Sequence, residues 1–498
     1  MILSRYTLKN IHVDSVSVPD ESLFELPEKV LQFGTGILLR GLPDYFIDKA
    51  NEKGLFNGRI VAVKTTPGDT TAFNRQDGLF THSIRENGIE TNRINSSISR
   101  VLSAKQHWNE ILDCAHSRDM QIIISNTTET GIQLLPEDIR QHPPKSYPGK
   151  LLSFLYERFK AFGGSAHSGM VIIPTELIPD NGKKLESIVL ELAHLNGLED
   201  EFIEWIEKQN SFCNSIVDRM VSMPDEAELS SLKSDLGYED HLLVLSEDYC
   251  RWEIEGNEKL KEILSFANAD DRVGISSNID TYGELVLSVL NSTITLTSGL
   301  AFLSGCQTVK DAMNDKTVSS FLTNLLQNEI IHSLPGEVEL TSAQKFASEL
   351  LVRFDNPCLN FLWSKITSDY SARMKAHCVP VLMQHYTKSD AVPEAMALGF
   401  AAYIYFMKAV KKDDQYFGEF NGKRYLIQDE QAGLFYKYWL GWSSASMVHV
   451  VLSDASWGAD LLSLPGFKQS VIDRLNLMVH NGMKDAVEST PLTKIKVA

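Results

Sequence analysis

The chain has 498 residues, with 47 Lys and Arg against 65 Asp and Glu, a formal net charge of −18 and 43 % apolar residues. This composition is typical of a folded protein of two or three domains and excludes an intrinsically disordered chain. Because the charge is acidic and no basic run occurs, we expect neither a nucleic-acid nor a membrane partner.

Residues 1–20 lack an apolar core behind a basic start, so we expect a cytoplasmic protein. The longest uncharged stretch, 285–309, carries many hydroxyl and amide side chains and is interpreted as a buried helical region. The six cysteines are far apart and have no histidine partner at zinc spacing. We therefore expect reduced core thiols and no metal.

Up to about residue 280, short β-branched runs alternate with helical segments. Four of the runs are typical of strands buried on both faces of a parallel sheet: 29–33, 59–63, 121–124 and 170–173. Apolar residues at helical spacing predict helices over 151–162, 184–195 and 201–209. Together these elements predict a doubly wound α/β domain over residues 1–280.

A glycine pair follows the first predicted strand. Gly34-Thr35-Gly36 precedes a helical run, which is the context that a dinucleotide-binding turn requires. The third glycine of the fingerprint is absent because position 39 is Leu, and Pro43 interrupts the expected helix. A plain strand-to-helix turn is therefore the alternative. After the second strand Lys64 comes before any acidic residue, which leaves the choice between NAD and NADP open.

Polar turns follow the third and fourth strands, at the sheet edge where open α/β sheets bind ligands. The first turn, 125–131, contains Asn126, Thr127 and Glu129, for which helix capping is the alternative. The second turn, 174–182, contains Pro174 and Pro179 and ends with Asn181-Gly182. A turn-forming Asn-Gly pair would explain Asn181 without any function.

Beyond residue 280 the pattern becomes helical. Helices are predicted over 283–305, 316–332, 342–353, 362–384, 391–411 and 466–483, with a turn or short hairpin at 422–425. No repeat of 20–50 residues is visible. We therefore predict an all-α C-terminal domain over residues 281–498.

Six motifs occur in a fixed order along nearly the whole chain: Leu31–Gly36 with Leu39-Arg40, Gln76–Thr81, Ser125–Glu129, Ile172–Pro174 with Glu176–Ile178, Asn210–Cys213 and Val217–Arg219. Together they resemble the mannitol dehydrogenase family of polyol-specific long-chain dehydrogenases, and within it the tagaturonate reductase (altronate oxidoreductase) branch. The resemblance implies a Rossmann-type N-terminal domain, an all-α C-terminal domain, and metal-independent hydride transfer between NAD and a small sugar-acid substrate.

The resemblance also implies site residues. The cofactor would be bound by Phe33, Gly34, Thr35, Gly36, Asn126, Thr127 and Glu129. The anionic substrate would be bound by Asp218 and Arg219, while Asn181 and Asn291 would polarise its carbonyl.

The catalytic motif departs from the family pattern, which is Lys-x4-Asn-x2-His on the first helix of the C-terminal domain. Asn291 matches the asparagine, but the lysine position is Val286 and the histidine position is Ile294. No Lys lies between Lys261 and Lys310, and no His between His241 and His332, so no shift of register restores them. At helical spacing Val286, Asn291 and Ile294 share a face, which has become more apolar.

Three hypotheses follow. The chain is an NAD-dependent sugar-acid oxidoreductase in which water or Tyr282 supplies the proton, although a packed interface tyrosine is the simpler interpretation of Tyr282. Alternatively it is a catalytically silent relative that binds a dinucleotide or sugar acid as a sensor or partner subunit. A third hypothesis is an altered reaction on a related sugar acid. His332 and His377 have no motif support and are interpreted as surface or packing residues. Both a monomer and a small homo-oligomer remain open.

Overall fold

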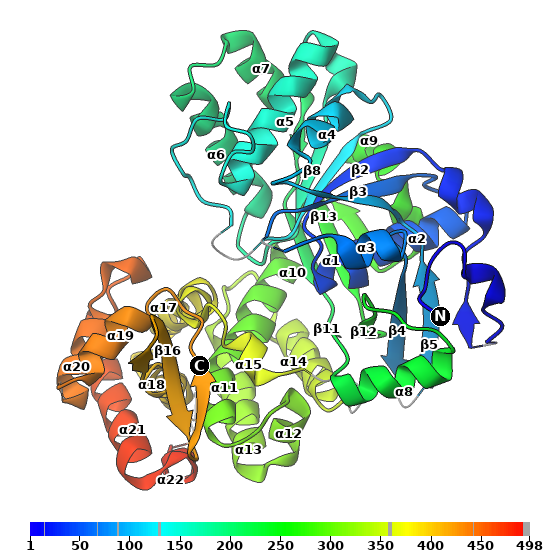
Figure 1. The fold of residues 1–498 in the computed structure, drawn as a ribbon. Coiled ribbons are helices and arrows are strands. Elements are labelled where there is room, and N and C mark those ends of the chain that lie inside the picture. The colour runs from blue at the N-terminus through cyan, green and yellow to red at the C-terminus, as the bar shows by residue number, and fades with distance from the viewer. Residues whose placement is uncertain are drawn as a thin grey trace. The chain divides into compact units, whose positions relative to one another are not determined.

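The computed structural model describes residues 1–491 except 14, 67, 87–88, 128–130, 357–360 and 442. The chain divides into two compact units, Met1–Ile279 and Asp280–Ala498. Figure 1 shows the helices and strands of both units.

The N-terminal unit is built on a six-stranded parallel sheet with the order β6-β3-β2-β7-β8-β9. Its strands are β2 Glu28–Phe33, β3 Arg59–Lys64, β6 Ile98–Ser103, β7 Ile122–Ser125, β8 Val171–Pro174 and β9 Ser211–Phe212. The four predicted strands are thereby confirmed. The first strand along the chain, β2, lies between β3 and β7, so the strand order reverses beside it, as in dinucleotide-binding folds.

Helices cover both faces of this sheet because its strand residues alternate between two cores. Leu31 and Phe33 belong to one cluster, and Val30 to the other. Helices α4 and α5 lie side by side on the first face (Figure 1). The helices of the unit are α1 Ile37–Gly41, α2 Pro43–Glu52, α3 Thr71–Arg75, α4 Trp108–Asp113, α5 Tyr147–Phe162, α6 Asn181–Leu195, α7 Asp200–Gln209, α8 Glu226–Leu236 and α9 Glu258–Ile263. The three predicted helices are confirmed.

Two further sheets of the N-terminal unit were not predicted. One has the order β1-β5-β4-β12-β11, and the other β10-β13-β14. Their bounds are β1 Val16–Ser17, β4 Phe80–Glu86, β5 Ile89–Asn95, β10 Ser215–Asp218, β11 Val221–Ser222, β12 Val244–Glu247, β13 Arg251–Glu255 and β14 Val273–Ser276. Strand β4 carries buried polar residues such as His82, which bonds to the Ser246 hydroxyl across to β12 at 2.7 Å. Such strands lack the apolar run that reveals the central sheet.

The C-terminal unit is organised around one long helix, Asp280–Leu303. It consists of α10 Asp280–Glu284, a π-helical segment Leu285–Asn291 and α11 Ser292–Leu303. In the described part of the chain it is the one helix long and apolar enough to cross a membrane, and 78 % of its apolar window is buried within the protein. The predicted buried helix is confirmed.

The long helix packs directly against α13, α14, α15 and α18, which belong to the further helices of the unit. These further helices are α12 Val309–Asn314, α13 Lys316–Asn324, α14 Leu340–Phe354, α15 Trp363–Ile366, α16 Tyr370–Arg373, α17 Val379–Lys388, α18 Glu394–Phe406, α19 Ala432–Trp439, α20 Ser444–Leu452, α21 Phe467–Asn481 and α22 Met483–Glu488. Two more π-helical segments, Leu325–Ile330 and Met374–Cys378, pack against the first one.

The unit is mainly helical but also contains a small antiparallel sheet of β15 Val410–Lys412, β16 Gln415–Phe420 and β17 Lys423–Leu426. The predicted helix 391–411 therefore ends earlier, at Phe406. The predicted hairpin is present: Asn421 and Gly422 have positive φ of 51° and 72°, as a two-residue hairpin turn requires.

Candidate functional site

The glycine turn lies at the point where the strand order of the parallel sheet reverses. Gly34 has a φ of +134°, and a Cβ there would lie 2.7 Å from Leu39 Cδ1 and 3.0 Å from the Asn126 carbonyl oxygen. Only glycine fits this position. Gly36, by contrast, is exposed and has nothing within 4 Å of a Cβ. The turn thus leaves an open space over the carboxyl ends of β2 and β7, where such folds place a pyrophosphate.

The helix after the turn is interrupted at Pro43, as the sequence predicted. Helix α1 ends at Gly41, and α2 begins at Pro43 after a non-helical Leu42. Gly41, at the end of α1, packs against β11 of another sheet, where a Cβ would lie 2.6 Å from Val221 Cγ1. The third glycine of the fingerprint is thus absent from α1, where position 39 is the buried Leu39.

The turns after β7 and β8 are joined by hydrogen bonds. The Asn126 amide donates to the Thr175 carbonyl and hydroxyl oxygens at 3.0 and 3.1 Å. The Thr127 N–H and hydroxyl both donate to Glu176 Oε1 at 2.8 Å. The structure thus brings Asn126 and Thr127 to the same sheet edge as the glycine turn, while Glu129 lies outside the described residues.

Glu176 is a buried carboxyl group, and burial raises its pKa above the ordinary value of 4.5. The protonated form is therefore favoured in the folded state, so the free energy of unfolding falls as pH rises from about 4.5 through the folded pKa. We expect Glu176→Gln, which keeps the acceptor for Thr127, to abolish this fall. Urea unfolding between pH 4 and 9 measures it, with Glu110→Gln on the exposed side of α4 as control. Parallel pH curves for the wild type and Glu176→Gln would contradict the assignment.

The other predicted cofactor residues lie around the turn in different ways. The Phe33 side chain is fully buried, with its ring 5.2 Å from that of Tyr147. Because this side chain packs in the core, a contact between Phe33 and the cofactor would have to be made by its backbone atoms. Thr35 is half-buried within the turn. Lys64, at the end of β3, donates to the Thr66 hydroxyl at 3.2 Å and remains exposed enough to reach a ligand.

Asn181 is held by hydrogen bonds inside the N-terminal unit, and its expected role in polarising a carbonyl stays a prediction. Its amide donates to the carbonyl oxygens of Pro174, Glu176 and Ser215 at 3.2, 2.9 and 2.9 Å, and its oxygen accepts from the Ser215 N–H at 3.0 Å. The side chain is 1 % exposed. Both amide hydrogens are therefore used inside the protein, and Asn181 anchors the β8 turn to β10.

We expect Asn181→Ala to lower the free energy of unfolding by about 1–3 kcal/mol, because buried backbone groups lose their partners. Chemical denaturation measures this loss. Glu191→Ala, on the exposed side of α6, is the control and should change stability by less than about 0.5 kcal/mol. Equal stability of Asn181→Ala and the control would refute the anchoring role.

Arg219 also forms hydrogen bonds inside the N-terminal unit, and its expected contact with substrate stays a prediction. Its guanidinium donates to the Glu247 carbonyl oxygen at 3.0 and 2.8 Å and to the Gly41 carbonyl oxygen at 2.8 Å, and lies 4.7 Å from the Tyr45 ring centre. Asp218, the other predicted substrate ligand, is 2 % exposed at the end of β10. Arg219 therefore holds the glycine-turn helix against β12, and Asp218 lies in the interior with it.

In the C-terminal unit a π-helical segment sets the geometry of the positions at which the sequence predicts a catalytic motif. In a π-helix the hydrogen bonds join residues five apart, so Val286 and Asn291 lie one turn above each other. Ile294 follows Asn291 at the i+3 spacing of helix neighbours. The three side chains thus share one face more closely than α-helical spacing predicted. Their exposed fractions are 1, 9 and 8 %.

Two polar side chains of the long helix are predicted catalytic residues: Asn291 in this segment and Tyr282 just before it. The Asn291 amide nitrogen is buried and has no hydrogen-bond partner among the described residues. Tyr282, one turn before Val286, is half-buried with its ring edge-on to Phe346 at 6.4 Å. Asn291 therefore retains a donor for a ligand, and the role of Tyr282 as proton donor stays a prediction.

The described residues contain no group of three or more His, Cys, Asp or Glu side chains that could hold a metal ion. The five described cysteines are free and buried, and burial raises the pKa of Cys306 to about 11. His377, interpreted from the sequence as a surface or packing residue, is buried, and its ring nitrogens have no partner among the described residues. It lies on the segment that packs against Leu285–Asn291. No sequence pattern marks it.

Comparisons with known proteins place this geometry in context. The profile of the mannitol dehydrogenase Rossmann domain matches residues 28–265, and that of the mannitol dehydrogenase C-terminal domain matches residues 278–479. The altronate oxidoreductase of Bacillus subtilis (strain 168) is 34 % identical over 93 % of this chain and 95 % of its own length. That of Klebsiella pneumoniae (strain 342) is 34 % identical over 93 % and 97 %.

Solved structures show the same fold. The mannitol 2-dehydrogenase of Pseudomonas fluorescens, in a ternary complex with NAD and D-mannitol, has a TM-score of 0.85 and 22 % identity over 98 % of this chain and 99 % of its own. A substrate-free D-sorbitol dehydrogenase has a TM-score of 0.69 and 20 % identity over 98 % and 100 %.

Proposed function

Because the chain belongs to the mannitol dehydrogenase family, we propose that it is an NAD-dependent oxidoreductase that interconverts a CH–OH group and a ketone of a sugar acid. Relatives named altronate oxidoreductase, similar over nearly the whole chain, support D-altronate and D-tagaturonate as the pair. The single observation that carries the proposal is the glycine turn at the strand-order reversal of a six-stranded parallel sheet.

The residues around the turn fit a dinucleotide. Gly36 leaves open space for a pyrophosphate, and Asn126 and Thr127 lie at the neighbouring strand end. When bound, NAD would supply the hydride acceptor and NADH the donor. We propose NAD rather than NADP on the evidence of the NAD complex of the mannitol 2-dehydrogenase. Lys64 is the cation that would favour a 2′-phosphate, so both cofactors belong in the test.

The substrate oxygen would be held by the C-terminal unit. Asn291 offers a buried amide without a partner, and each positioned donor of this kind contributes about 10²–10³-fold to a reaction through an oxyanion. The acid–base groups of the family pattern are replaced by Val286 and Ile294. Because a positioned acid contributes about 10²–10⁴-fold, we expect slow turnover with intact cofactor binding.

The same replacement favours a second candidate function. A protein that keeps the glycine turn but has apolar side chains in place of both titratable groups could bind NADH or a sugar acid as a sensor or as the partner of an active enzyme. This candidate predicts binding of NADH without any hydride transfer.

The proposal is tested by NADH and NADPH oxidation with D-tagaturonate, D-fructuronate and D-fructose, at enzyme concentrations high enough to detect slow turnover. The proposal expects oxidation of NADH with a sugar acid and none with D-fructose, which lacks the carboxylate. NADH binding in a fluorescence titration without oxidation with any substrate would favour the silent relative. Loss of NADH binding would exclude both.

A further inference from the structure

Several buried polar side chains of the C-terminal unit have no hydrogen-bond partner among the described residues, and two of them, His377 and Asn291, lie on π-helical segments that pack against each other. His377 is 2 % exposed, and neither ring nitrogen has a partner in the described part of the chain. Asn291 Nδ2 is in the same condition. On α17, His385 has both nitrogens satisfied, by the Ser333 hydroxyl at 3.1 Å and the Ala391 carbonyl oxygen at 2.8 Å. An unpaired buried donor costs about 1–3 kcal/mol, so such groups often await a ligand.

The contacts between two chain segments fix where His377 lies relative to the long helix. The Trp363 N–H donates to the Gln307 carbonyl oxygen at 3.0 Å, just beyond that helix. The Tyr370 hydroxyl donates to the Thr295 carbonyl oxygen at 3.0 Å and accepts from the Gly299 N–H at 3.0 Å. The two segments therefore run antiparallel. Residue 363 lies opposite residue 307, and residue 370 lies opposite about residue 297 of the long helix.

Continued along both segments, this register would place His377 near Asn291. His377 lies seven residues after Tyr370, or about 10 Å along the chain of helical turns. The same distance along the partner leads from about 297 to about 290. Accordingly, the π-helical segments Met374–Cys378 and Leu285–Asn291 pack against each other. π-Helical segments are rare and concentrate at functional sites.

We propose that His377 and Asn291 together hold the reacting oxygen of the sugar acid, so that His377 is a further catalytic residue. This inference rests on the proposed function. Burial, together with the nearby Arg373, lowers the pKa of His377 to about 3, so the imidazole is neutral and offers one N–H donor. A neutral imidazole can polarise a carbonyl in this way.

The chemistry requires hydrogen bonds only from these two residues. As hydride reaches the carbonyl carbon, the electron pair of the C=O bond moves onto the oxygen, where the His377 N–H and the Asn291 amide stabilise the charge. That oxygen then takes a proton from water, and the hydroxide left behind is neutralised in solvent. Neither side chain gives up its proton. His377 and Asn291 thus supply the hydrogen bonds to the oxygen, but not the proton, that the family's Lys and His would supply.

The test is a titration of protein labelled with ¹⁵N in its histidines, with D-altronate as the probe. The inference expects D-altronate to shift the His377 ring resonances, assigned with His377→Gln, and to leave those of His385 in place. It further expects His377→Phe to weaken D-altronate binding and lower kcat by at least 10-fold. His377→Gln, which keeps an N–H donor, should recover part of both.

Unmoved His377 resonances at saturating D-altronate, or equal kcat in the wild type and His377→Phe, would overturn the inference while leaving the proposed function intact. Shifted His377 resonances without any hydride transfer would support the polar pair and refute the redox function. The wild-type titration decides the matter even where a variant fails to fold.

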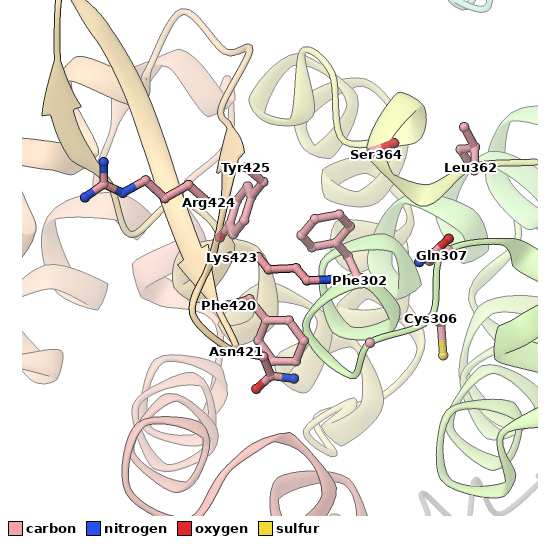
Figure 2. Close-up of a pocket in the computed structure, with 11 residues that line it drawn as sticks. Phe302, Cys306, Gln307, Leu362, Ser364, Phe420, Asn421, Lys423, Arg424 and Tyr425 are labelled. Atoms are coloured by element: carbon pink, nitrogen blue, oxygen red, sulfur yellow. The ribbon is translucent and has the colours of Figure 1, made fainter. Parts of the chain in front are cut away.

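A second, independent observation is a cavity of about 430 Å³ in the same unit, beside the end of α11 and the β16–β17 hairpin (Figure 2). Phe302 lies 11 residues beyond Asn291, about 16 Å along the helix, so this cavity is separate from the polar pair. Three rings line it: Phe302, Phe420 and Tyr425. Tyr425 is fixed by its hydroxyl, which donates to the Phe406 carbonyl oxygen at 2.8 Å.

The charge of this cavity is positive. Figure 2 shows the Lys423 side chain reaching toward Phe302, while Arg424 points away from the other lining side chains. Within the described ranges, no Asp or Glu lines the cavity, and Lys423 forms no ion pair. The amides of Gln307 and Asn421 add polar contacts at the rim. We infer that this cavity takes a small organic anion with a flat apolar ring.

Calorimetric titration with salicylate tests this second inference, with inorganic phosphate as the anion without a ring. We expect saturable salicylate binding, weaker phosphate binding, and at least a fivefold loss of salicylate affinity in Lys423→Gln. Lys412→Gln, an exposed lysine of neighbouring strand β15 outside the cavity, is the matched control. Absence of saturable binding, or equal losses in both variants, would overturn it.

Discussion

Turnover of D-tagaturonate with NADH is expected to rise by about 10²–10⁴-fold in the double variant Val286→Lys, Ile294→His. The reason is that the two substitutions restore a titratable acid on the helix face that already presents Asn291. Position 286 is 1 % exposed, and burial lowers the pKa of a lysine, which brings its proton within reach of a nascent alkoxide near neutral pH. The measurement is kcat for NADH oxidation under saturating substrate.

The matched control is Val286→Met, Ile294→Gln, which fills similar volume without a group that titrates near neutral pH. Its kcat should stay within about threefold of the wild type, because it supplies no acid. Thermal unfolding of both variants separates a chemical effect from loss of the fold, since a buried lysine also destabilises. Equal kcat in the two folded variants would show that proton transfer does not limit the wild type.

Gly36→Val is expected to weaken NADH binding by about 100-fold, or about 2.7 kcal/mol, while leaving thermal stability unchanged. Gly36 has a φ of −67°, which any residue adopts, and nothing lies within 4 Å of its Cβ. The added side chain therefore meets no protein atom at its Cβ and enters the space where the pyrophosphate would lie. A fluorescence titration with NADH, together with a melting curve, measures both effects.

Gly34→Ala provides the contrast, because its Cβ would press on Leu39 and on the Asn126 carbonyl oxygen at a φ of +134°. This variant should lose stability as well as NADH binding. Unchanged NADH affinity in a well-folded Gly36→Val would mean that the dinucleotide does not cross this turn. We therefore expect Gly34 to be required for the fold of the turn, and Gly36 to be required for NADH binding.

The parallel sheet could be predicted because its strands are continuous apolar runs buried on both faces, such as Ile122–Ser125. The glycine turn was recognisable from its place after such a strand. The sheet containing β4 was not, because its buried polar residues pair with partners far along the chain, as His82 does with Ser246. The pattern of apolar and polar residues within one strand does not predict a hydrogen bond to a residue far along the chain.

The candidate site was predictable only in part, for a related reason. Gly36, Asn126 and Thr127 lie at strand ends, where position in the sequence determines position in space. Asn181 and Arg219 also lie near strand ends, but each donates hydrogen bonds to backbone carbonyl groups that are far away in the sequence. The sequence alone does not predict these partners. The π-helical segment and His377 depend on helix packing, which periodicity alone does not reveal.

The central claim is that this chain transfers hydride from NADH to a sugar-acid ketone despite lacking the family's Lys and His. The most direct measurement is deuterium transfer from [4,4-²H₂]NADH, labelled on both faces of the nicotinamide, into D-altronate, followed by mass spectrometry after prolonged incubation of the wild-type protein with D-tagaturonate. The account predicts D-altronate carrying one deuterium, formed slowly and absent with Gly36→Val. Saturating NADH binding with no deuterated product would contradict it and leave a dinucleotide-binding protein without redox chemistry.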